Sequence, residues 1–463
     1  MPAVALARRS PSAPIVFDVA AGACLIAGNT LGGLIFPPQW MVGGLFPPVF
    51  VGMALVAIRC VRYPVPSLFA TWWPRATAHA VVRTALSVAL VTRAAVLAVG
   101  LVAAIHHPAR FTVAPKVSDD ALVNLPARWD AFWYLGIARY GYEAAPTRED
   151  HQHNIAFFPA YPAAMRVAGD LVVIPAYLFN APSFLGNGDS RVLWGGVFAS
   201  VLFFALALAR LQRLASIDLP PAAADRACVL TAVYPFALFF SAPYSESLAL
   251  LALVSLVLAW RARDGRGVWW GILFGLTRSN GWCVAVALAA DRLLSREPGR
   301  SRVSWWLVAS APIGAALYSL YVWHLTGHPL QWAAAQHAWG GKLQPLEFVV
   351  RRWNTIDARG LRGYVRHDPA DAAAFVAAMG MLAASVWLLA RRQWLYGMLI
   401  LAYLGPAIAI DLPATGRMTA LLFPAFFILA ERFRGVRFAA LAILFAVGQA
   451  WLASRFFEWR TPY

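Results

Sequence analysis

Charged residues are scarce in this chain. Of its 463 residues only 13% are charged, whereas 60% are hydrophobic and the mean hydropathy is +0.60. A soluble domain carries about 25% charged residues, so the composition excludes an ordinary soluble protein. It predicts an all-α polytopic membrane protein, in which the thickness of the bilayer sets the length of each helix.

Cysteine is also rare, and several functional patterns are missing. The four cysteines, Cys24, Cys60, Cys228 and Cys283, stand singly and form no CxxC pair, which argues against a disulfide framework. No Walker loop occurs, so nothing indicates nucleotide-driven transport. No internal repeat is evident, which counts against a transporter built from repeats.

Lysine occurs only twice, as Lys116 and Lys342, among 39 basic residues. This bias towards arginine indicates GC-rich coding and a bacterial source. The net charge of +17 does not indicate nucleic-acid binding, because the arginines form short clusters between apolar runs and no basic amphipathic module. Such clusters are typical of the positive-inside signal of membrane proteins. We therefore expect a multi-pass protein of the bacterial plasma membrane, with the endoplasmic reticulum membrane as the alternative.

The apolar runs predict a bundle of about 11–13 transmembrane helices, each about 20 residues long. The expected spans are residues 15–36, 40–58, 84–105, 191–210, 228–242, 244–260, 305–325, 372–390, 394–411, 418–431 and 438–454. Residues 1–80 form an N-terminal extension with two spans, and residues 81–463 form the catalytic domain. Arg8-Arg9 precedes a first span without a cleavage site, so we expect that span to be retained.

Placing Arg8-Arg9 inside makes the two long loops, residues 106–162 and 326–371, exoplasmic. Two segments leave the topology open. Residues 163–182 cross the membrane, lie in its interface or re-enter it. Residues 267–290 are flanked by arginines on both sides, so two half-helices meeting at residues 277–281 would keep both clusters inside. A single tilted span with snorkelling arginines is the alternative.

Asp130 stands among large aromatic residues just after an apolar run, in the segment Arg128-Trp129-Asp130-Ala131-Phe132-Trp133. A carboxylate at a membrane edge is costly without a function, so we interpret it as a general base for transfer to a hydroxyl group. The alternatives are a helix cap or a salt bridge with Arg128.

Glu246 lies between two apolar runs, in the segment Pro243-Tyr244-Ser245-Glu246-Ser247. It is the second candidate catalytic acid, and there it would orient an acceptor, bind a cation or pair with Arg278. The alternative is an interfacial acid that caps the next helix.

Arg278 and Asn280 would suit a leaving group that carries a phosphate, because a guanidinium matches phosphate with paired donors. Arg417 is the second phosphate candidate, since it lies at the outer edge, where positive charge is disfavoured. Each of these arginines could instead be a topology charge.

Histidines supply the weakest candidates. His151 and His153, beside Glu149 and Asp150, have spacing that suits metal coordination, although the segment also resembles an ordinary solvated loop. A divalent metal therefore stays open, and no cofactor is predicted. In the second loop, Gln336 and Trp339 offer hydrogen bonds and a stacking surface for a sugar.

Six segments in this order resemble the PIG-V-like family, which includes the second mannosyltransferase of GPI-anchor assembly and its prokaryotic relatives. They are Trp129-Asp130, Ala156-Phe157-Phe158-Pro159, Tyr244-Ser245-Glu246, Arg278-Ser279-Asn280-Gly281, Gln336…Trp339-Gly340 and Arg417 followed by Phe423-Pro424. The resemblance covers roughly residues 84–431. The chain departs from the pattern in its first 75 or so residues and at Met418, where an aromatic residue is expected.

The resemblance implies a GT-C bundle with an exoplasmic active site. It also implies transfer of mannose from a polyprenyl- or dolichyl-phosphate donor to a lipid, glycan or protein, with inversion at the anomeric carbon. Asp130 would be the base. The candidate substrate-binding residues are Arg128, Trp129, Tyr244, Arg278, Asn280, Gln336, Trp339 and Arg417.

Two other functions stay open. A transporter or flippase of a lipid-linked sugar would share the basic pocket and need no general base. A non-catalytic scaffold subunit would need neither the basic pocket nor a general base.

Overall fold

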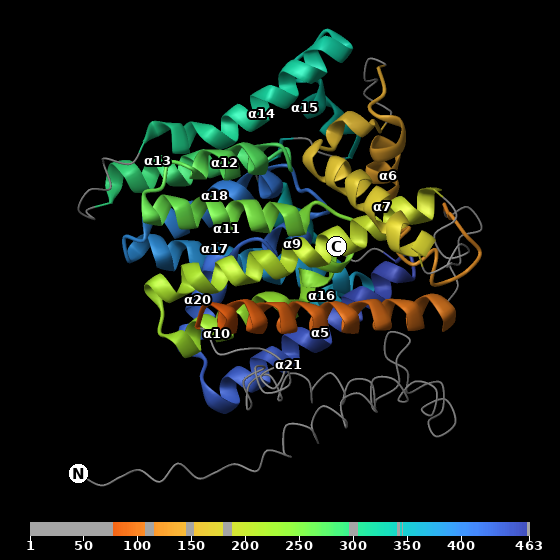
Figure 1. Ribbon diagram of the computed structural model, residues 1–463. Coiled ribbons are helices and arrows are strands. Elements are labelled where there is room, and N and C mark those ends of the chain that lie inside the picture. The colour runs from red at the N-terminus through yellow and green to blue at the C-terminus, as the bar shows by residue number, and fades with distance from the viewer. Residues whose placement is uncertain are drawn as a thin grey trace.

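The computed structural model describes residues 77–106, 115–144, 152–178, 188–295, 304–339, 343–344 and 346–460, and these ranges contain helices and no strand (Figure 1). The all-α class predicted from the sequence is therefore confirmed. The α-helices are α5 (Thr77–His106), α6 (Ala131–Tyr140), α7 (Ala160–Leu178), α9 (Gly188–Asp218), α10 (Pro221–Val233), α11 (Glu246–Ala262), α12 (Gly267–Gly275), α13 (Val284–Leu294), α14 (Trp305–Thr326), α15 (Gln331–Ala335), α16 (Glu347–His367), α17 (Pro369–Ala390), α18 (Trp394–Ala409), α19 (Thr415–Thr419), α20 (Phe423–Arg432) and α21 (Gly435–Phe457). Short 3₁₀ turns are η2 (Asn154–Ala156), η3 (Pro235–Ser241), η4 (Gly281–Cys283) and η6 (Gln336–Trp339).

Five of the described helices are long and apolar enough to cross a membrane, namely α5 from Thr84, α9, α14, α17 and α21. The pair formed by α10 and η3 adds a sixth crossing if its two helices, bent by 77°, count as one span. These helices confirm a polytopic membrane protein. The predicted spans at residues 15–36 and 40–58 lie outside the described residues, and the total of about 11–13 helices stays a prediction.

The basic clusters gather at one end of the bundle. Arg261 at the end of α11 pairs with Asp218 at the end of α9, and the Tyr396 hydroxyl near the start of α18 donates to the same carboxylate. Close by, Arg226 of α10 donates to the carbonyl of Ala430 near the end of α20. The helix α6, which follows Asp130, lies at the other end (Figure 1). The described arginine clusters therefore share one end of the bundle, and the side of the membrane that this end faces stays a prediction.

Residues 267–294 turn back on themselves. A Cβ atom on Gly267, at the start of α12, would lie 2.6 Å from the Cβ of Ala259 in α11. At the end of α13, the carboxylate of Asp291 accepts a hydrogen bond of 2.7 Å from Trp260, the next residue of α11. Both ends of the segment therefore lie at the basic end of the bundle. The two predicted half-helices are present, and a single tilted span is excluded.

Glycines bring α12 against α14 with almost no space between the backbones. A Cβ atom on Gly271 would lie 1.7 Å from the Ser310 hydroxyl, and one on Gly275 would lie 2.0 Å from the carbonyl oxygen of Ala311. A Cβ on Gly314 would meet the carbonyl of Ile272 at 2.2 Å. Small residues that permit such close approach are typical of helix pairs in membranes.

Residues 163–182, whose topology the sequence leaves open, contain most of α7. This helix packs against α9, since a Cβ atom on Gly195 would lie only 2.3 Å from the backbone nitrogen of Gly169. The helix α7 is not among the apolar helices long enough to cross a membrane in the described part of the chain.

The bend between α10 and η3 is stabilised by two buried side chains from other helices. The Arg93 guanidinium of α5, only 1% exposed, donates to the carbonyls of Ala232 and Ala237. The amide of Gln449 in α21 donates to the carbonyls of Ala232 and Tyr234, at 3.0 and 2.8 Å. A broken helix at membrane depth must have its freed carbonyls satisfied by protein, and these contacts do so.

The substitution Arg93→Met tests this explanation. It removes the Arg93 donor from the buried carbonyl of Ala237 and leaves the carbonyl of Ala232 with Gln449 alone, and an unsatisfied buried group costs about 1–3 kcal/mol. We expect the apparent Tm of the purified protein to fall by more than about 5 °C. The control is Arg437→Met, at an exposed position of α21. Equal Tm values for the two variants would contradict a role for Arg93 in holding the bend.

Candidate active site

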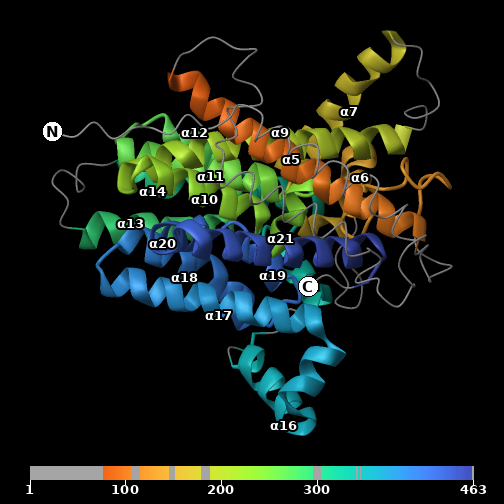
Figure 2. The ribbon, with the colours of Figure 1, turned by 90° about the horizontal axis from the view of Figure 1, so that it is seen from below.

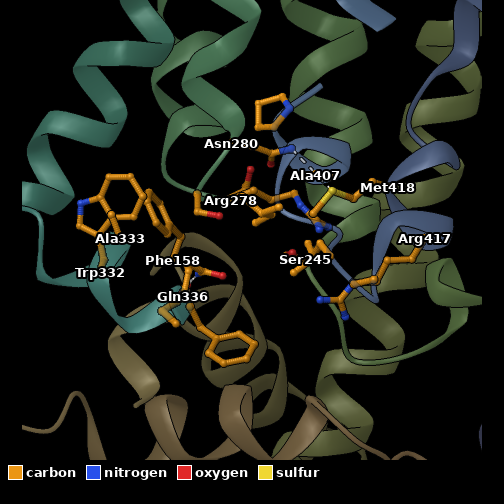
Figure 3. Close-up of a pocket in the computed structure, with 18 of the residues that line it drawn as sticks. Phe158, Ser245, Arg278, Asn280, Trp332, Ala333, Gln336, Ala407, Arg417 and Met418 are labelled. Carbon is orange, nitrogen blue, oxygen red and sulfur yellow. Dashed lines mark hydrogen bonds between the residues drawn. The ribbon is translucent and has the colours of Figure 1, made fainter. Parts of the chain in front are cut away.

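A cavity of about 320 Å³ lies between the start of α6 and the break that separates α12 from α13 (Figure 3). Its volume is at the lower end of the range of roughly 300–1,000 Å³ for small-molecule sites. The start of α6, the break between α12 and α13, the α15–η6 segment and residues 406–418 all contribute walls. Five of the predicted site residues line it directly, and they are Asp130, Arg278, Asn280, Gln336 and Arg417.

Four charged side chains form a row beside the cavity. Arg417 Nη1 lies 2.6 Å from Asp130 Oδ2, and Arg417 Nε lies 3.5 Å from Glu246 Oε1. Arg278 Nη1 lies 2.5 Å from the same Glu246 oxygen. The side chain of Glu246 is only 1% exposed, and that of Arg278 is 7% exposed. Two acids and two bases thus neutralise one another, as buried charges require.

Asp130 is held in place through its backbone. It is the residue before α6, and its amide donates a hydrogen bond of 3.0 Å to the hydroxyl of Tyr244. That hydroxyl donates in turn to the carbonyl of Arg128. The Asp130 side chain makes no cap hydrogen bond to α6. Neither alternative role predicted for this carboxylate, a helix cap or a pair with Arg128, is found.

Glu246 begins α11 and pairs with Arg278, one of the roles that the sequence left open. Its Oε1 atom accepts from Arg278, whereas its Oε2 atom is buried without a hydrogen-bond partner. The carboxylate is not among the groups lining the cavity. Its contacts with groups that do line the cavity are those with Arg278 and Arg417, and its catalytic role stays a prediction.

The break between α12 and α13 supplies Arg278 and Asn280. The Asn280 amide donates to the carbonyl of Tyr403 in α18 at 3.1 Å, which ties the break to the next wall. Its Oδ1 atom is buried without a partner, and so is the hydroxyl of Tyr403. These two polar atoms beside Arg278 are free to accept or donate hydrogen bonds.

The wall opposite the arginines is aromatic. The rings of Phe158 and Trp332 meet edge to face with centroids 5.2 Å apart. Gln336, beside them, donates to the carbonyl of Ala156 at 3.0 Å. Figure 3 shows this group across the cavity from Arg278 and Arg417. The cavity thus offers an apolar surface on one side and cationic donors on the other.

Tyr134 of α6 also lines the cavity. Burial, together with the nearby negative charge of Glu246, raises the pKa of Tyr134 to about 12. The phenol therefore keeps its proton near neutral pH, and it donates to the Ser245 hydroxyl at 3.1 Å. Tyr134 is thus a hydrogen-bond donor in this site. Among the described residues that line the cavity, Asp130 is the one that carries a carboxylate.

Three predicted substrate-binding residues have other contacts. Arg128 donates to the carbonyl of Phe457, and the indole of Trp129 donates to the carbonyl of Phe456, both at the end of α21. Tyr244 is fully buried and contacts the backbone around Asp130. None of the three is among the cavity-lining residues. Their contacts lie around the backbone of Asp130, and their role in binding a substrate stays a prediction.

The metal candidates gain no support. His151 and the side chain of Trp339 lie outside the described residues. His153 is buried, with Nδ1 3.4 Å from a Glu143 carboxylate oxygen. Within the described chain, no group of three His, Cys, Asp or Glu side chains could hold a metal ion.

Sequence reasoning missed Trp332, Tyr403 and the wall at residues 410–414. Tyr403 stands inside the apolar run 394–411, where a tyrosine resembles an ordinary packing residue. Only its unpaired hydroxyl beside Arg278 distinguishes it, and that requires the fold.

Residues 82–294 match the model of a family described as mannosyltransferase (PIG-V). The chain is 33% identical over 187 residues to the GPI alpha-1,6-mannosyltransferase 2 of Rattus norvegicus, which covers 38% of this chain and 35% of that protein. It is 32% identical over 188 residues to the Homo sapiens protein of the same name, with the same shares. The chain thus matches about a third of the length of these relatives. The predicted resemblance is confirmed over a range that includes Asp130, Glu246 and Arg278 and ends before Arg417.

The substitution Arg278→Met tests the charge row. It leaves the buried Glu246 carboxylate with only the more distant Arg417, and breaking a buried pair costs about 3–5 kcal/mol. We expect a clear drop in thermal stability for Arg278→Met, and a smaller drop when Glu246→Gln is added. A coupling free energy of at least about 1 kcal/mol in this double-mutant cycle is expected. Strictly additive losses would contradict the pairing.

Proposed function

We propose that this chain is an integral-membrane glycosyltransferase that transfers mannose from a polyprenyl- or dolichyl-phosphate donor to an acceptor hydroxyl, with inversion. The observation that carries the proposal is the position of Asp130 in a cavity with two arginines. The match to the mannosyltransferase family and the names of the relatives support the choice of sugar.

In this proposal Asp130 is the general base. The acceptor oxygen forms a bond to the anomeric carbon of the sugar while its proton passes to the Asp130 carboxylate. The bond from the anomeric carbon to the phosphate oxygen breaks, and the lipid phosphate leaves with the electron pair. One base suffices, because inversion involves no covalent intermediate on the enzyme.

Arg278 and Arg417 are proposed to bind the phosphate of the donor. Both line the cavity, and a guanidinium can direct two N–H groups at one phosphate. Their positive charges would stabilise the negative charge that grows on the leaving oxygen. Glu246, which touches both arginines and not the cavity, would fix their orientation.

The aromatic wall is proposed to hold the sugar. Phe158 and Trp332 offer apolar ring surface, while Asn280 and Gln336 offer amide groups to hydroxyls. The acceptor is a lipid, glycan or protein on the same side of the membrane as the cavity, and the arginine clusters at the other end favour the exoplasmic side.

The decisive variant is Asp130→Asn. It keeps the shape of the side chain and removes its basicity, so we expect transfer to fall by about 10²–10⁴-fold. The assay measures sugar transfer from radiolabelled polyprenyl-phosphate mannose to a membrane lipid and glycan extract. The matched control is Glu143→Gln, an exposed acid that does not line the cavity, which should keep full activity.

Other outcomes have defined meanings. Full transfer by a folded Asp130→Asn protein would refute the base. Wild-type protein that moves the donor across reconstituted vesicles without transferring its sugar would replace the transferase with a flippase. If the purified chain neither transferred the sugar nor moved the donor across the membrane, the scaffold function would be the remaining alternative.

A further inference from the structure

The helix α16 stands apart from the bundle and carries an apolar face without a protein partner in the described chain (Figure 2). On its first arm Val349 and Trp353, four residues apart, are 44% and 67% exposed. On its second arm Leu361 and Val365, also four residues apart, are 63% and 45% exposed. Residues spaced by four lie on the same face of a helix, so each arm has one apolar stripe facing outwards.

The same helix is strongly basic. It contains five arginines against two acids, Glu347 and Asp357. Arg359, Arg362 and Arg366 are exposed and make no ion pair or hydrogen bond with the described part of the chain. A helix with an apolar stripe beside arginines is typical of segments that lie in the surface of a membrane.

The inner face of α16 is firmly anchored. Arg352, only 3% exposed, pairs with Asp371 at the start of α17 and with Asp411 after α18. Arg351 also pairs with Asp411, at 2.6 Å. On the second arm, the Tyr364 hydroxyl donates to Asp371. With the inner face tied down, the direction in which the apolar stripes point is fixed.

The anchors also set the level of α16 relative to the bilayer. The apolar helix α17 begins at Pro369, two residues after α16 ends at His367. Just before α16, the amide of Gln344 donates to the carbonyl of Ala409, the last residue of α18. Both ends of the segment therefore meet the ends of apolar helices, which is where the lipid headgroups of a surrounding bilayer would lie.

A break at Gly360 divides α16 into its two arms. Gly360 has φ +70° and ψ 160°, a conformation that side chains rarely adopt, and it ends the first arm.

We propose that α16 is a membrane-surface helix that binds anionic phospholipids. Its apolar stripes enter the acyl region beside the headgroups, and Arg359, Arg362 and Arg366 bind the lipid phosphates. This inference does not depend on the reaction proposed above, because it rests on α16 and its anchors alone.

The test is site-directed spin labelling of the full chain in vesicles. The four native cysteines are replaced by alanine, and single cysteines are placed at Val349, Trp353 and Leu361. Leu444, exposed on the crossing helix α21, is the lipid-facing control, and Asp119, in an exposed ion pair, is the water-facing control. We expect each of the three α16 labels to be more accessible to molecular oxygen than to a water-soluble nickel complex. The label at Leu444 should show the same order of accessibility.

A second arm of the experiment tests the charge. In vesicles of phosphatidylcholine with phosphatidylglycerol, the label at Leu361 should have a higher ratio of oxygen to nickel accessibility than in phosphatidylcholine alone. The triple substitution of Arg359, Arg362 and Arg366 by glutamine should abolish that difference.

Three results would overturn the proposal. If the labels at all three positions were as accessible to the nickel complex as the label at Asp119, the stripes would lie in water. Immobile labels that neither reagent reaches would mean that a protein, either another copy or a different partner, covers the helix. A Leu361 label that responds to phosphatidylglycerol equally with and without the arginines would overturn the lipid-phosphate contact.

Discussion

The whole site depends on one constraint, that backbone polar groups in an apolar bundle must be hydrogen-bonded by protein. An intact helix meets this condition by itself, and a broken helix does not. At the bend between α10 and η3, Arg93 and Gln449 supply the missing donors. After the bend the chain reaches Tyr244 and Glu246, which lie beside the cavity. The bend that Arg93 and Gln449 stabilise therefore places this segment at the site.

The second break follows the same rule and serves a second purpose. Between α12 and α13 the chain stops being helical where Arg278 and Asn280 stand, and Asn280 bonds across to α18. A side chain on a regular helix at this point would face a neighbouring helix. On the break it faces the cavity, beside the charges of Asp130, Glu246 and Arg417. Irregular backbone and buried charge therefore occur together.

The sequence predicted which residues carry charge to the site and offered the pair of Glu246 with Arg278, but it did not predict the partner of Asp130. Asp130, Arg278 and Arg417 are chemically conspicuous in apolar surroundings, and all three line the cavity. The partner of Asp130 was sought two residues away in Arg128, whereas it is Arg417, 287 residues further along the chain. Spacing along a chain reports neighbours on one helix, and only packing decides which helix ends meet. Tyr403 was missed for the same reason, because its unpaired hydroxyl has meaning only beside Arg278.

The glycine contacts between α12 and α14 have a mechanical consequence. With Gly271 against Ser310 and Gly275 against Ala311, neither helix can rotate or slide without a backbone collision. The break that bears Arg278 is thus attached to a close-packed helix pair, which fixes the position of the cavity wall that carries Arg278. The short helix α15 on the other side is tied in place as well, because the indole of Trp332 donates to the Ser319 hydroxyl of α14 at 2.8 Å and its ring packs edge to face on Phe158. A bulky ligand therefore meets a cavity whose two facing walls are both attached to α14.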